Sequence, residues 1–100
     1  MTNRQKVEDL VKGEPVDGLE LVVLRRYPRR MINSAKYTGL IAAACGRDET
    51  GIVGIVLWGD QVEKVKSGNV IRIENGSVSM NEEELVVSAG PNGAVEVLGE

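Results

Sequence analysis

Apolar and polar side chains alternate along several short stretches of this chain, which is the pattern of β-strands with one buried face. The stretches expected to form strands, by this pattern or by a short apolar run between turns, are residues 19–24, 37–45, 52–58, 70–74 and 85–88, with a short arm at 77–80. Turn-forming residues separate them, as in Asp48-Glu49-Thr50-Gly51 and Asn75-Gly76. Several short strands joined by tight turns predict a mainly β domain.

Two segments show helical spacing instead. Residues 2–12 place apolar side chains three and four positions apart, and Thr2 with Gln5 forms a capping-box pattern at their start. After the third strand, Asp60 and Glu63 form a second capping box. The pattern therefore predicts one N-terminal helix and one short helix between strands three and four.

This order of elements predicts a five-stranded OB-fold barrel with a short N-terminal helix and a helix between strands 3 and 4. The helix between strands would close the open end of the barrel. One hundred residues can form one modest core. We therefore expect a single domain over residues 1–100, with the N-terminal helix in 1–13 and a tail of little pattern in 90–100.

The third expected strand is apolar on both of its faces. The residues expected to fill the barrel are Val53, Ile55 and Leu57. The outward set is Ile52, Gly54, Val56 and Trp58. Ala42 and Ala44 of the preceding strand are expected to extend this outward apolar face. Such a face either contacts a partner or is covered by the helices of the same chain, and the pattern leaves both alternatives open.

Composition argues against catalysis and against a bound cofactor or metal. The chain has no His and one Cys, and no Ser or Cys stands near a recognisable base. The segment 51–54 lacks the lysine and the helix of a phosphate-binding loop. A single cysteine excludes an internal disulfide and favours the cytoplasm. No apolar run is long enough to span a membrane, so no membrane partner is expected.

Charge is distributed unevenly along the chain. The formal net charge of −3 argues against a strong polyanion binder. However, residues 1–50 contain nine Lys/Arg and seven Asp/Glu, whereas residues 51–100 contain three and eight. The basic residues gather between the first two strands, at Arg25, Arg26, Arg29, Arg30 and Lys36, beside Tyr27 and Tyr37. Arginine can pair with phosphate and stack on a base, but a basic loop can also be merely solvated.

Three segments are more specific than the strand pattern. Asp48-Glu49-Thr50-Gly51, Val56-Leu57-Trp58-Gly59-Asp60 and the run from Lys66 to Asn75 resemble the OB domains of archaeal single-stranded DNA-binding proteins and replication protein A. The resemblance extends over nearly the whole chain. It implies a non-catalytic domain of DNA replication and repair without a cofactor. Single-stranded DNA is the implied partner, with RNA as the alternative.

The resemblance also implies which residues contact the nucleic acid. Trp58 stands at the family position whose ring stacks on a base, although a large ring can also simply close the end of a barrel. The basic loop would lie beside the binding groove. The resulting candidate set is Arg25, Arg26, Tyr27, Arg29, Arg30, Lys36, Tyr37, Trp58 and Arg72.

The sequence departs from this family at the last hairpin. Relatives carry further aromatic residues there, whereas this chain has Ser77, Met80 and Asn81. Three carboxylates follow in residues 82–84, where they either repel phosphate or only keep the tip soluble. Relatives also tend to carry polar groups on the outer face of the third strand. Together these departures favour a second hypothesis, in which the domain contacts a copy of itself or another replication or repair protein.

Overall fold

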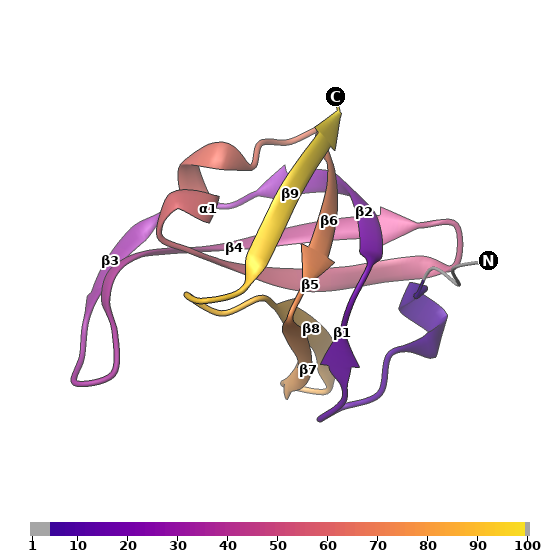
Figure 1. The fold of residues 1–100 in the computed structure, drawn as a ribbon, viewed down its shortest axis with the longest axis horizontal. Coiled ribbons are helices and arrows are strands. Elements are labelled where there is room, and N and C mark those ends of the chain that lie inside the picture. Colours follow the sequence, from indigo (N-terminus) through magenta and orange to yellow (C-terminus); the bar gives the residue numbers. More distant parts are fainter. Residues whose placement is uncertain (1–4, 100) are drawn as a thin grey trace.

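Nine strands, one short α-helix and one turn of 3₁₀ helix make up residues 5–99, the part of the chain that the computed structural model describes (Figure 1). In chain order they are η1 (Val7–Asp9), β1 (Pro15–Val16), β2 (Leu19–Arg26), β3 (Arg30–Asn33), β4 (Thr38–Asp48), β5 (Gly51–Trp58), α1 (Asp60–Lys64), β6 (Val70–Glu74), β7 (Gly76–Asn81), β8 (Glu84–Ser88) and β9 (Ala94–Gly99). No helix among these residues has the length and apolar character needed to cross a membrane.

The strands form one curled sheet in the order β1-β7-β8-β5-β4-β2-β6-β9, with β3 paired to β4 (Figure 1). Only Asn75 separates β6 from β7, although these strands lie near opposite ends of that order. The sheet therefore closes on itself through a bend at Asn75. Joining β6 to β7 and β8 to β9 gives the five predicted barrel strands, with β5 and β8 parallel as in an OB barrel. The predicted fold class is confirmed.

The barrel interior is filled by the residues that alternate inward along each strand. Val53, Ile55 and Leu57 of β5 are all buried, as the sequence predicted. Side chains with less than 2% of their surface exposed include Leu19, Leu21, Ile55, Leu57, Ile71 and Ile73. Burying each one contributes roughly 1.5–3 kcal/mol, so this layer provides the main stabilisation of the fold.

The predicted N-terminal helix is wrong in extent. Within residues 5–12, the described part of the expected helix, only η1 is helical, and Thr2 of the expected capping box lies outside the described residues. After η1 the backbone is extended, because it pairs with β7. The Gly13 N–H donates to the Val78 carbonyl at 2.8 Å, and the Val78 N–H donates to the Glu14 carbonyl at 3.1 Å. Tertiary pairing thus overrides a weak local preference for helix.

The second capping box is also wrong. Gly59 occupies the N-cap of α1 with φ of 59°, and no side chain caps the helix. Gln61 takes over the polar contacts at this corner. Its side-chain oxygen accepts from the Trp58 N–H at 3.1 Å, and its amide donates to the Gly90 carbonyl at 3.1 Å. These two bonds tie the end of β5 to the connection between β8 and β9.

The expected tail contains a strand. β9 pairs with β6 in antiparallel register, with Ile71 opposite Val97 and Ile73 opposite Val95. Val95 is buried and Glu96 exposed, so the segment has the same alternation as the other strands. Its two inward valines are too few to stand out from the surrounding Gly, Asn and Pro in the sequence.

Asn75-Gly76 is a bend within a long strand rather than a hairpin turn. Asn75 has φ of 55°, and its N–H donates to the Asp17 carboxylate at 2.9 Å. A Cβ at Gly76 would lie 2.8 Å from the Ser88 carbonyl oxygen, so only glycine lets the two strands approach here. Asn75-Gly76 does mark a sharp change of chain direction, as predicted, but β7 continues directly from β6.

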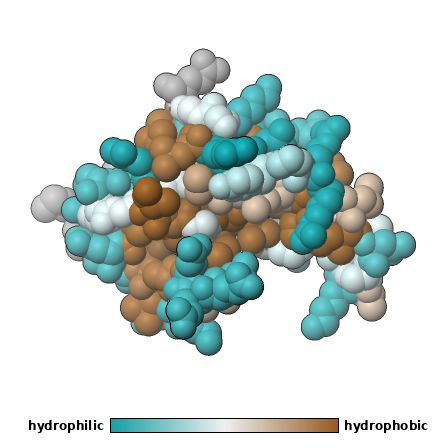
Figure 2. All heavy atoms as spheres, turned by 180° about the vertical axis from the view of Figure 1, so that it is seen from behind, coloured by the Kyte–Doolittle hydropathy of each residue, from teal (hydrophilic) through white to brown (hydrophobic). Residues whose placement is uncertain are grey.

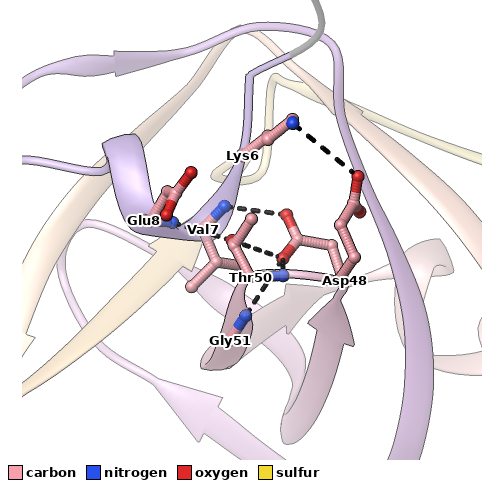
Figure 3. Close-up of polar contacts among 7 residues, drawn as sticks. Lys6, Val7, Glu8, Asp48, Thr50 and Gly51 are labelled. Atoms are coloured by element: carbon pink, nitrogen blue, oxygen red, sulfur yellow. Dashed lines mark hydrogen bonds and ion pairs between the residues drawn. The ribbon is translucent and has the colours of Figure 1, made fainter.

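Asp48 organises the turn between β4 and β5, as Figure 3 shows. One carboxylate oxygen accepts from the Thr50 N–H at 2.7 Å, the Thr50 hydroxyl at 2.6 Å and the Gly51 N–H at 3.2 Å. The other accepts from the Val7 N–H at 2.8 Å, and the Thr50 hydroxyl oxygen accepts from the Glu8 N–H at 3.0 Å. The predicted turn is confirmed, and it also fastens η1 to the barrel.

These contacts set the ionisation of Asp48. Partial burial alone would raise the pKa of the Asp48 carboxyl, but hydrogen bonds from Thr50, Val7 and Gly51 lower it below the ordinary value of 3.8. The folded state therefore favours the carboxylate. Since the unfolded chain binds its proton more readily, this contribution to stability is present above about pH 3.8 and is lost as the pH falls through the lowered pKa.

Asp48→Ala is expected to lower the free energy of unfolding at pH 7 by about 2 kcal/mol, because several charge-assisted hydrogen bonds are lost together. Urea denaturation followed by circular dichroism measures the loss. The difference from the unmodified chain should shrink as the pH falls below 3.8. Asp9→Ala, which removes an exposed carboxylate of η1, is the matched control and should cost little. An equal loss in both variants would contradict the role of Asp48.

Candidate nucleic-acid interface

The outer face of β4 and β5 is the surface on which the candidate residues converge. The register pairs Trp58 with Ile41, Val56 with Ala43 and Gly54 with Cys45. Because directly opposed residues share a face, Ile41, Ala43 and Cys45 lie outside with Trp58. The expectation for Ala42 and Ala44 is wrong, since both are buried in the core. Their parity along β4 is opposite to the one assumed.

A row of directly opposed residues on this face has a basic side chain at one end and an aromatic ring at the other. Arg30 of β3 lies opposite Ile41 of β4, and Ile41 lies opposite Trp58 of β5. Two strand spacings place Arg30 and Trp58 roughly 10 Å apart across the sheet. The row therefore combines a basic side chain, an apolar side chain and an aromatic ring in one line.

An arm projects from the barrel beside this row. It consists of β3, the following turn and the start of β4, and it extends away from the body of the molecule in Figure 1. Seen from behind, apolar side chains gather near the middle of the molecule, and a hollow separates the arm from the rest (Figure 2). A groove of about 380 Å³ runs along the base of the arm; its lining residues are Tyr27, Pro28, Arg30, Ile41, Ala42, Ala43, Val56 and Asn81.

Tyr27 supplies one aromatic surface in this groove. Its ring is 40% exposed, and the Arg25 guanidinium lies 5.0 Å from the ring centroid. The Tyr27 N–H donates to the Ala43 carbonyl at 2.9 Å, which holds the backbone of Tyr27 against β4. A base stacked on this ring would have a cation nearby.

Trp58 and Tyr37 form a second aromatic unit. Their ring centroids are 4.9 Å apart and the planes are perpendicular. The Trp58 indole N–H donates to the Ser88 hydroxyl at 2.7 Å, and the Tyr37 hydroxyl donates to the Leu40 carbonyl at 2.8 Å. Trp58 lies outside the barrel and is half-buried, so these contacts fix the ring without hiding it. Tyr37 positions Trp58 in this arrangement.

The predicted cations fall into two groups. Arg26 donates to the Val62 carbonyl at 3.1 Å, Arg29 pairs with Glu63 at 2.8 Å, and Arg72 bridges acidic side chains. Among residues 5–99, no acidic partner is found for three others, which are Arg25, Arg30 and Lys36. These three are the cations best placed to meet phosphate.

Arg72 lies away from the candidate face. It stands on β6 between Glu20 of β2, at 2.9 Å, and Glu96 of β9, at 3.3 Å. The hydrogen bonds that the guanidinium donates to Glu20 raise the pKa of Arg72, and the negative charge of Glu96 raises it further. In the sheet, β2 separates β6 from β4. The structure therefore does not bring Arg72 together with the other candidate residues.

Some residues on this surface were missed by the sequence reasoning. Ile41 and Ala43 form its apolar centre, and Asn81 lines the groove from the β7–β8 hairpin. Arg47 also shares the outward parity of Ile41 and is exposed. Every second residue of β4 faces outward, but three consecutive alanines give no contrast that shows which of the two alternating sets does so.

The β7–β8 hairpin brings negative charge to the groove. Asn81 lines it, and Glu82, Glu83 and Glu84 follow at the exposed tip. Glu82 and Glu83 have φ of 51° and 72°, a conformation that two-residue turns require and that Asn and Gly adopt more easily. The groove thus has one basic rim, on the arm, and one acidic rim.

Comparison with known proteins gives the family of this chain and agrees with its fold. The family model described as "Single-stranded DNA binding protein Ssb-like, OB fold" matches residues 19–97. The single-stranded DNA-binding protein Ssb of Saccharolobus solfataricus is 29% identical over 86 residues, which is 86% of this chain and 58% of that protein. The chain thus spans a little over half the length of this relative.

Two solved structures share the fold. The OB domain of Ta0387 from Thermoplasma acidophilum superimposes with a TM-score of 0.79 at 20% identity, covering 97% of this chain and 88% of that domain. The second OB-fold domain of replication protein A from Methanococcus maripaludis gives 0.77 at 19% identity, covering 98% and 97%. The barrel and its connections are therefore those of an OB domain.

Proposed function

The chain belongs to the Ssb-like family of OB-fold single-stranded DNA-binding proteins, a non-catalytic family, and we propose that it binds single-stranded DNA across the outer face of β4 and β5. The observation that carries this proposal is the row Arg30, Ile41 and Trp58, which opens onto the groove beside Tyr27. The cytoplasm, expected from the single cysteine, is where we place this binding.

The proposed contacts divide between rings and cations. Trp58 and Tyr27 would each take a base, and stacking contributes about 1–3 kcal/mol per base with little sequence preference. Arg25, Arg30 and Lys36 would meet phosphates, since none of them has an acidic partner within residues 5–99. With two exposed stacking sites and three cations, binding should be modest in strength and sensitive to salt.

Titration of labelled oligo-dT at two salt concentrations, followed by fluorescence anisotropy, tests the proposal. Arg30→Gln is expected to weaken binding severalfold at low salt. It should also reduce the slope of log K against log salt by about 0.7, the value for one phosphate contact on a single strand. Arg72→Gln removes the same charge from β6 and should leave the slope unchanged. Equal effects of the two substitutions would show that only net charge matters.

The same titration distinguishes RNA from DNA. Stacking platforms accept either backbone, and only contacts with the 2′-hydroxyl separate them. We expect matched DNA and RNA oligomers to compete, with DNA the tighter ligand. Preference for RNA would assign the same surface to the alternative partner.

Apolar residues at the other end of this face favour protein contact as a second candidate function. Ile52 is 67% exposed and Val22 is 41% exposed, and both lie opposite Arg47 in one cross-strand row. Large apolar side chains exposed on one face, here on either side of Arg47, are typical of an interaction surface. Sedimentation velocity at micromolar concentration tests self-association. A monomer that Ile52→Ser leaves unchanged would count against this use of the surface.

A further inference from the structure

A second groove is lined by Trp58 and by Tyr37 of the arm. It measures about 440 Å³ and is lined by Tyr37, Trp58, Gly59, Asp60, Gln61, Lys64, Pro91, Gly93, Ala94 and Val95. Its walls are the start of α1 and the connection between β8 and β9, which approach each other near the end of β5 (Figure 1). Its volume falls within the roughly 300–1,000 Å³ usual for small-ligand sites.

Trp58 belongs to this groove and to the row described above. Ile41, the cross-strand neighbour of Trp58, lines the first groove, whereas Trp58 itself lines the second. The two grooves are therefore linked through the directly opposed pair Ile41 and Trp58. A strand that stacks a base on Trp58 enters the second groove if it continues in the same direction.

The polar side chain in the floor of the second groove already has its hydrogen-bond partners within the protein. Gln61 is 8% exposed, and both ends of its side-chain amide are hydrogen-bonded to the backbone, at Trp58 and Gly90. Val95 is buried beside it, and Pro91 adds an apolar wall. These groups offer flat, apolar contact without requiring a polar partner from a ligand.

Two residues on one face of α1 supply the charged groups that the floor of the groove lacks. Asp60 and Lys64 are four residues apart, both are exposed, and both line the groove. No ion pair joins them in the described part of the chain. The ammonium of Lys64 can meet a phosphate, and the carboxylate of Asp60 can only accept hydrogen bonds.

We propose that this second groove holds the nucleotide that follows the base stacked on Trp58, with Lys64 at its phosphate and Asp60 at the edge of its base. The proposal rests on the proposed binding of single-stranded DNA. It adds a subsite and a base preference to that function. An ionised carboxylate needs hydrogen-bond donors, and guanine presents two adjacent ones on its Watson–Crick edge. Thymine presents one donor between two acceptors, so guanine is the preferred base and thymine the least favoured.

A single guanine moved along a thymine 12-mer tests this preference. With fluorescence anisotropy as readout, the unmodified protein should bind about five- to tenfold more tightly when guanine occupies one particular position than when it occupies the others. Asp60→Ala should abolish this maximum, so that affinity no longer depends on the position of the guanine. A flat profile for the unmodified protein would overturn the proposal.

Lys64 is tested by comparison with a neighbouring lysine. Lys64→Gln is expected to weaken binding of the 12-mer about threefold, because it removes one phosphate contact. Lys66→Gln removes the same charge two residues away, outside the groove, and should have little effect. If Lys64→Gln behaves like Lys66→Gln while Arg30→Gln still weakens binding, the second groove is excluded and the function stands. If no oligomer binds, both proposals fail.

Discussion

Replacing Glu82, Glu83 and Glu84 together by Gln is expected to tighten binding of single-stranded DNA about tenfold at low salt. The three carboxylates stand at the tip of the β7–β8 hairpin, and Asn81, next to them, lines the groove together with Tyr27 and Arg30. A phosphate held by the arm therefore lies close to the acidic rim. The proposed binding of DNA would therefore occur against this repulsion.

The expected size follows from Coulomb's law. One pair of like charges 10 Å apart in water costs about 0.4 kcal/mol, and three carboxylates facing several phosphates multiply that cost. Salt screens charges over about 10 Å at 0.1 M. The gain should therefore shrink as salt rises, and anisotropy titrations with labelled oligo-dT at low and high salt measure both values.

A control variant has to show whether the gain in affinity depends on where the carboxylates lie or only on the net charge of the protein. Neutralising Glu8, Asp9 and Glu74 changes the net charge by the same amount at exposed positions away from the groove. We expect this variant to gain much less affinity. A second variant, Glu82→Asn with Glu83→Gly, also relieves the positive φ of both residues and should raise stability together with affinity. Equal gains in the groove variant and the control would refute an electrostatic role of the tip.

The barrel was predictable because its strands are specified by local patterns. The alternation in β2, β5 and β6 marks their inward residues, and Asp48 with Thr50 and Gly51 specifies a turn by its own hydrogen bonds. These signals are short in range, so the sequence carries them in full.

The errors come from interactions between distant parts of the chain. The stretch before β1 is extended because it pairs with β7, and β9 exists because β6 offers it an edge. Ala42 to Ala44 could present either parity outward, and only the pairing with β5 settles that Ala43 faces out. A pattern of one segment cannot contain the position of its partner.

The sequence predicts which types of residue form the candidate site. It does not predict which of those side chains are already engaged in contacts within the protein. The sequence marks six basic residues and three aromatic rings as one candidate set. The structure engages Arg26, Arg29 and Arg72 in contacts within the protein, and it sets Arg72 on another part of the barrel. Those contacts join residues 34 to 52 positions apart, which no local spacing reports. What remains on the face is a smaller set, centred on Arg30 and Trp58.

Trp58→Leu is expected to weaken binding of oligo-dT about tenfold or more, because one stacked base contributes about 1–3 kcal/mol. Leucine keeps an apolar side chain on the outer face, so the β4–β5 pairing with Ile41 should persist. The substitution removes the ring and its hydrogen bond to Ser88. Circular dichroism and thermal denaturation would show whether the barrel remains folded.

The interpretation of Trp58 as a ring that merely closes the barrel makes the opposite prediction. In that case Trp58→Leu would lower stability and leave the affinity of the folded protein unchanged. Trp58→Phe separates the two further, because phenylalanine retains a stacking surface but has no N–H for Ser88. We expect Trp58→Phe to keep most of the affinity and lose some stability, whereas Trp58→Leu loses the affinity. The outward parity of Trp58, its contact with Tyr37 and its place in the lining of the second groove all favour stacking.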